Sequence, residues 1–164
     1  PGEVHAVLLA LMDSRSSALA VAALRAARSL GWAPPIERLL AITDAVHPDA
    51  RAAAAATLDA SDPRAEAKLA ALLENNERPV VLAAIESLGR AAGVGAVLAL
   101  LPLSQGRLGA ADVRKAAATA IAKIQERNPG TSGQLALSEE GAESGQVSLA
   151  PSRGTVAIAD KKQS

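Results

Sequence analysis

The chain has 164 residues, enough to bury one domain-sized core, and its composition favours helices built from small aliphatic side chains. Hydrophobic residues make up 49% of it and aromatic residues only 1%, with Trp32 alone in that class. Lysine plus arginine and aspartate plus glutamate both number 17, so bulk charge does not favour nucleic acid or an anionic membrane as partner. The absence of cysteine excludes disulfides, thiolate chemistry and cysteine-based zinc sites, and no apolar run approaches the ~20 residues of a membrane span.

Apolar periodicity and the residues that interrupt it predict four pairs of helices. In chain order we expect helices over residues 4–12 and 17–30, 36–45 and 49–60, 64–74 and 78–91, and 94–101 and 112–127. Pro34-Pro35 and Pro63 separate neighbouring helices, because proline disrupts a helix interior but suits a first turn. The chain therefore reads as all-helical up to Arg127.

The second helix of each pair has a recurring entry. Three of these helices open with an acid followed closely by arginine, and the first opens more weakly, with Ser16-Ser17; the acid and arginine residues are Asp49 and Arg51, Glu77 and Arg78, and Asp112 and Arg114. Counted from Ser17 and the three arginines, the spacings are 34, 27 and 36 residues, typical of a stacked helical array. Seven residues after each start we expect a core side chain, namely Leu24, Leu58, Ile85 and Ile121.

Short antiparallel helices with an acid–arginine turn and an alanine-rich second helix resemble the HEAT-like repeat family, particularly its bacterial phycobilisome-lyase-type branch. The resemblance implies a right-handed α-solenoid of about four helix pairs over residues 1–127, which we expect to be the C-terminal part of a longer array. It also implies that the acids and arginines of neighbouring repeats form a buried structural ladder: Asp49, Arg51, Glu77, Arg78, Asp112 and Arg114. The same branch leaves open a second function, that of a lyase or chaperone module acting on a bound cofactor.

Residues 128–164 differ in pattern from the helical region. Three segments, 133–138, 145–150 and 154–159, each run from glycine and a polar residue into alternating apolar and small residues. Period-two alternation predicts short strands, so we expect a C-terminal β segment with one apolar face: Leu135, Leu137, Val147, Leu149, Val156 and Ile158. We expect it to dock on the last helix pair or to extend the sheet of a partner, whereas composition alone favours a disordered tail.

Residues that commonly carry catalysis are few and isolated. His47 precedes a helix entry, where a structural role is expected, and His5 has no acidic residue three or four positions on. No serine lies in a nucleophile motif, and the glycine-containing segment 89–95 follows a helix and lacks the ending of a phosphate loop. We therefore expect no enzyme activity, no metal and no cofactor.

The outward face of the second helices is the remaining candidate site. It combines small side chains with charges of mixed sign, and the expected interaction residues are Arg25, Ala56, Asp59, Ala83, Glu86 and Lys123. The small residues are explained by close helix stacking or, alternatively, by a low groove for a partner helix or strand. We predict a non-catalytic scaffold or adaptor for another protein, possessing no membrane-inserting segment. Nucleic-acid binding is disfavoured because aromatic residues are missing, and Trp32 is expected to pack beneath the Pro-Pro turn rather than anchor an interface.

We expect no signal peptide and a cytoplasmic rather than a secreted protein, although a chain without cysteine suits any compartment.

Overall fold

The computed structural model describes residues 2–106 and 110–129, all within one compact unit, Pro1–Ser132. In these residues the chain forms eight helices and no strand, which confirms the predicted all-helical fold of this part. The helices are α1 (Gly2–Met12), α2 (Ser17–Ser29), α3 (Ile36–Ile42), α4 (Pro48–Thr57), α5 (Pro63–Leu72), α6 (Arg78–Ala91), α7 (Gly95–Gln105) and α8 (Ala111–Arg127). The predicted β segment, with its apolar face from Leu135 to Ile158, lies outside the described residues.

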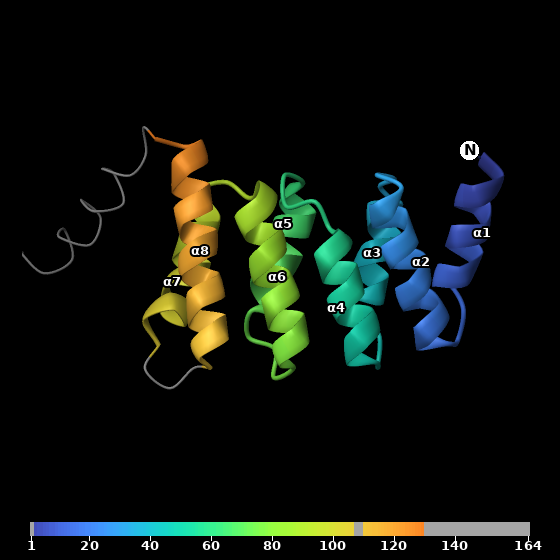
Figure 1. Ribbon diagram of the computed structural model, residues 1–164, viewed down its shortest axis with the longest axis horizontal. Helices are drawn as coiled ribbons and strands as arrows, with labels where there is room; N and C mark the ends of the chain where they lie inside the picture. The colour runs from blue at the N-terminus through green and yellow to red at the C-terminus, as the bar shows by residue number, and fades with distance from the viewer. Residues whose placement is uncertain (1, 107–109, 130–164) are drawn as a thin grey trace, which may run out of the picture. The chain divides into compact units, whose positions relative to one another are not determined.

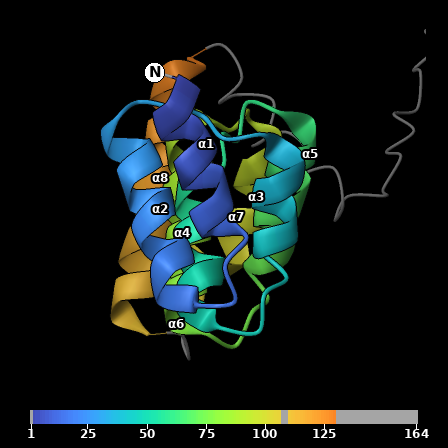
Figure 2. The ribbon, with the colours of Figure 1, turned by 90° about the vertical axis from the view of Figure 1, so that its right-hand side faces the viewer.

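The helices of this unit lie in two layers, with successive helices alternating between them (Figures 1 and 2). In one layer α2 packs on α4, α4 on α6 and α6 on α8; in the other, α3 contacts α5 and α5 contacts α7. Each odd-numbered helix packs against the even-numbered helix that follows it. The four even-numbered helices, here called the second helices, run in the same direction, so their N-terminal ends share one edge and their C-terminal ends the other (Figure 1).

The core between the layers consists of aliphatic side chains and alanine. Leu24, Leu58 and Ile85 are buried as predicted, whereas Ile121 is only half-buried and Ile124 takes the fully buried place in α8. Small side chains fill a core only where helices approach closely. Helices α6 and α8 approach closely at Gly89, where an added Cβ would lie 2.7 Å from the Cβ of Ala120 and 2.9 Å from its Cα.

Several helix ends differ from the sequence-based expectation: α1 begins two residues early, at Gly2, α3 ends at Ile42 and not at residue 45, and α5 ends at Leu72 and not at residue 74. α4 ends at Thr57, before the predicted residue 60, because Leu58 turns to an extended conformation (ψ 136°) and is buried in the core. α7 continues to Gln105, past the predicted end at residue 101, although Pro102 lies within it. Proline removes the hydrogen bond to the carbonyl of Leu98, but both residues are exposed, so water can satisfy that carbonyl.

None of the helices in residues 2–106 and 110–129 combines the length and the apolar character that crossing a membrane requires.

Candidate interaction face

Shallow grooves with small-residue floors follow one another along the outer face of the second helices. A groove of about 280 Å³ spans α2, α4 and α6, and a groove of about 370 Å³ lies between α2 and α4. The floor of the first is formed mainly by Ala52, Ala53, Ala56 and Ala83. Arg25 and Asp49 line both grooves and supply charges of opposite sign. This part of the face therefore has low relief, with charged side chains at the margins of its grooves.

A further groove, of about 380 Å³, lies between α6 and α8. Its floor is apolar and is formed by Leu82, Ile85, Gly89, Ala116 and Ala120. Charged side chains of both signs stand around this floor: Glu86, Asp112, Lys115 and Lys123. The close packing at Gly89 thus sets the depth of a groove as well as the distance between two helices.

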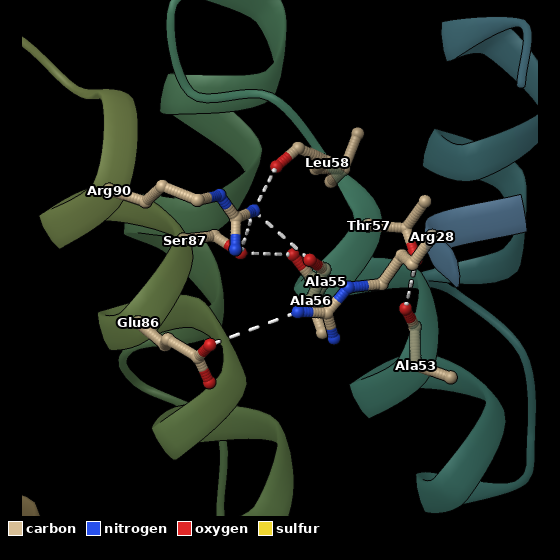
Figure 3. Close-up of polar contacts among 9 residues, drawn as sticks. All are labelled: Arg28, Ala53, Ala55, Ala56, Thr57, Leu58, Glu86, Ser87 and Arg90. Atoms are coloured by element: carbon tan, nitrogen blue, oxygen red, sulfur yellow. Dashed lines mark hydrogen bonds and ion pairs between the residues drawn. The ribbon is translucent and has the colours of Figure 1, made fainter. Parts of the chain in front are cut away.

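Above α4, two charged side chains from the flanking helices approach each other. Arg28 extends from α2 across Ala56 toward Glu86 of α6 (Figure 3). The distance between Arg28 Nη2 and Glu86 Oε1 is 3.8 Å, and the two side chains are 44% and 64% exposed. An ion pair this long and this exposed contributes little to stability, so both side chains are available to a partner.

Arginines in the last turns of α6 and α8 cap the preceding second helix. Arg90 donates from Nη2 to the carbonyls of Ala56 (3.0 Å) and Leu58 (3.2 Å), at the end of α4 (Figure 3). Arg127 makes the equivalent contact with α6, donating to the carbonyls of Gly89 (2.7 Å) and Ala92 (3.0 Å). The last carbonyls of a helix lack intrahelical donors, and a cation also favours that end of the helix dipole.

The buried hydroxyl of Ser87 supports the Arg90 contact. It donates to the carbonyl of Ala55 at 2.7 Å and accepts from Arg90 Nη2 at 3.1 Å. Arg90 and Arg127 were not among the site residues predicted from the sequence. The signal that could have found them is an arginine at the same place in two helices, 12 residues after Arg78 and 13 after Arg114.

The predicted acid–arginine ladder has one clear link. Arg78 Nε and Nη2 both donate to Oδ2 of Asp112, at 2.8 and 2.5 Å, and so join α6 to α8. This hydrogen bonding holds the pKa of the Asp112 carboxyl below its ordinary value. The side chains are 62% and 38% exposed, so the link is a surface ion pair and not the buried contact that the resemblance implies.

The other four ladder residues are placed differently. Within the described part of the chain no ion pair joins Asp49 to Arg51, and the buried Nε of Arg51 has no hydrogen-bond partner. Glu77 is the N-cap residue of α6, but its side chain makes no capping bond. Arg114 is half-buried in the first turn of α8.

The predicted interaction residues all line a groove or cleft on the outer face of the second helices. Arg25, Asp59, Glu86 and Lys123 are exposed there, while Ala56 and Ala83 are half-buried in the floors. Trp32 is half-buried beyond the end of α2, with its ring stacked on that of His5; the ring centroids are 4.4 Å apart and the planes differ by 6°. His47, the other histidine, is the exposed N-cap residue of α4.

Across the described residues, no group of three or more His, Asp or Glu side chains is placed to hold a metal ion. No family model matches the chain, and a search of curated proteins finds no match to it.

Proposed function

We propose that this chain is a non-catalytic scaffold that binds an elongated segment of another protein across the outer face of its second helices. The observation that carries the proposal is the succession of grooves from α2 to α8, with small-residue floors and charges of both signs at their margins. A flat, alanine-floored surface accommodates the backbone and side chains of a helix or strand without rearrangement.

We also propose that the helices form an α-solenoid of HEAT-like helix pairs. Two features support it: each second helix packs on the next one, and the arginine cap is repeated from α6 to α4 and from α8 to α6. In such arrays each repeat contacts its neighbours, and the layer of parallel helices forms an extended binding surface.

Charge on this face is distributed between the two edges. Asp49 and Asp112 lie in the first turns of α4 and α8, whereas Arg28 and Arg90 lie in the last turns of α2 and α6. Each edge also carries the opposite sign, because Arg78 and Lys115 lie near Asp112, and Asp59 lines the same cleft as Arg28 and Arg90. A bound segment that crosses the helices therefore meets charges of both signs at each edge. Complementary charges on the partner would fix its orientation and suppress binding in the reverse sense.

The test uses peptides selected from a random display library on the wild-type protein. Ala83→Arg places a long cation in the floor of the groove that spans α2, α4 and α6, and should weaken the selected peptides at least about tenfold, a change of ~1.4 kcal/mol in binding free energy. The matched control is Ala67→Arg, an exposed alanine on α5 in the other layer, which should leave binding unchanged. Equal binding by wild type and Ala83→Arg, with both proteins folded, would refute the proposed face.

A further inference from the structure

A cleft of about 410 Å³ lies where the C-terminal ends of α2, α4 and α6 meet. Its lining includes one aromatic ring, two cations and one anion: Trp32, Arg28, Arg90 and Asp59. Thr57 and Ala56 of α4 complete one wall. We name it the Trp32 cleft. Its combination of an aromatic surface with two guanidinium groups is unlike the aliphatic grooves elsewhere on the same face.

The backbone after α2 fixes the position of Trp32. Gly31 has a φ of +64°, a conformation that favours glycine, and its N–H donates to the carbonyl of Arg28 at 3.1 Å. The N–H of Trp32 donates to the carbonyl of Ala27 at 2.9 Å, which completes a Schellman motif. Since the indole also stacks on His5, it is a preformed wall of the cleft, not a loop side chain that must be ordered on binding.

Arg90 is held in place with hydrogen-bonding capacity left over. Its Nη2 is directed at Ala56, Leu58 and Ser87, whereas Nε and Nη1 have no hydrogen-bond partner among the residues that the structure describes. The same contacts matter electrostatically. The C-terminal carbonyls of α4 would repel an anion, but Arg90 already covers those of Ala56 and Leu58.

The charges that line the Trp32 cleft do not balance. Arg28 and Arg90 carry two positive charges against the single carboxylate of Asp59. Asp59 is itself engaged, because its Oδ1 accepts from the N–H of Ser61 at 3.0 Å, and this hydrogen bond lowers the pKa of its carboxyl. The remaining partner of Arg28 is Glu86, at 3.8 Å, which lines a different groove. A carboxylate that displaces the exposed Glu86 from Arg28 would balance the lining charges, whereas Asp59 opposes a more highly charged group.

We infer that the Trp32 cleft binds a carboxylate of the partner protein between Arg28 and Arg90, with the adjoining part of the partner against the indole. Guanidinium groups match carboxylates in shape as well as in charge. The carboxylate is supplied by an aspartate or glutamate side chain or by the C-terminus of a chain. The inference rests on the proposed function for the nature of the partner, while the recognition of the carboxylate is a property of the cleft alone.

Trp32 reports binding directly, because the chain has one tryptophan, no tyrosine and no phenylalanine. Its fluorescence is followed while three acetylated tripeptides are added at low ionic strength: one with a glutamate side chain and an amidated end, one with a free C-terminal carboxylate and no acidic side chain, and a neutral glutamine peptide with an amidated end. We expect weak saturable binding, with a dissociation constant of ~1 mM, for at least one carboxylate peptide and none for the neutral one. Comparison of the two carboxylate peptides identifies the source.

Variants then locate the site. Arg28→Gln should weaken the binding about tenfold, whereas Arg15→Gln, at an exposed position between α1 and α2, should leave it unchanged. Arg28→Gln is the decisive variant, because Arg90→Gln also removes the cap of α4. The inference is overturned if Arg28→Gln binds like wild type, if the neutral peptide binds as well as the glutamate peptide, or if inorganic phosphate binds more tightly than both carboxylates. None of these results depends on Ala83, so the cleft and the proposed binding face can fail separately.

Discussion

Replacing Gly89 by alanine should destabilise the protein, even though alanine is the better helix former. Gly89 lies inside α6, where the change alone would favour folding by ~1 kcal/mol. The new Cβ, however, would lie 2.7 Å from the Cβ of Ala120 and 2.9 Å from its Cα, whereas ordinary contacts begin at 3.4 Å. Because one of these atoms belongs to the backbone, no side-chain rotation relieves the overlap, and α8 must move as a unit.

The size of the effect follows from that displacement. Moving the nearest contact from 2.7 to 3.4 Å requires a shift of about 0.7 Å, which would disturb the packing of the buried Ala117 and Ile124 as well. Overpacking of a core typically costs about 1–3 kcal/mol, and a shift of a whole helix belongs at the upper end of that range. After subtraction of the helix-propensity gain, we expect a net loss of ~2 kcal/mol in the free energy of unfolding.

Urea denaturation followed by circular dichroism measures this loss as a lower midpoint at unchanged slope. The matched control is Gly93→Ala, because Gly93 is exposed between α6 and α7 and an added Cβ there would have no atom within 4 Å. That variant should stay within about 0.5 kcal/mol of wild type. If Gly89→Ala proves as stable as wild type, α6 and α8 do not approach as closely as described, and the depth of the groove between them is also wrong.

Three further predictions concern the contacts between second helices. Ser87→Ala should lower the free energy of unfolding by about 1–3 kcal/mol, because it leaves the carbonyl of Ala55 without its donor. Thr119→Ala is the control and should change little in the same urea experiment, because the hydroxyl of Thr119 bonds only within its own exposed turn. Arg127→Gln should accelerate hydrogen exchange in the last turn of α6 while Lys123→Gln leaves it unchanged, and equal rates in the two variants would contradict the cap. Arg78 lowers the pKa of Asp112 in the folded state, so the pair stabilises the protein above the ordinary aspartate pKa, and its contribution is lost as the pH falls through the lowered value. The melting temperature of Asp112→Asn should therefore fall less steeply than that of wild type between about pH 5 and pH 2. Parallel curves for the two proteins would argue against the pair.

Much of the helical architecture was predictable because its signals are local. Proline, glycine and the apolar period act within a few residues of where they stand, and they predicted the eight helices of the described region in the right order. The position of the candidate interaction residues on the outer face was predictable for a related reason. Once the buried stripe of a helix is known, as at Leu24 and Ile85, the opposite face follows from the helical repeat alone.

The contacts between the second helices could be identified only from the tertiary structure. The resemblance paired the acids and arginines of neighbouring repeats, yet it could not decide which of them meet: Arg78 reaches Asp112, 34 residues away, while Arg51 is left with a buried Nε that has no partner in the described residues. Residues one or two positions apart on a helix do not face each other, so the acid beside each arginine is poorly placed to bond it.

At the ends of helices, too, the sequence predicted the residues but not their contacts. Sequence pattern places an arginine in the last turns of α6 and α8, but only the stacking of α6 on α4 brings Arg90 to the carbonyls of Ala56 and Leu58. The early end of α4 is likewise decided by the buried place that Leu58 finds in the core, against the helical tendency of its alanine-rich sequence. Where helices form and which stripe of each is apolar could be predicted from the sequence, because both depend on neighbours along the chain. The polar groups that meet depend on the distance between stacked helices and on their relative positions along the helix axes. Close packing of small side chains sets both quantities.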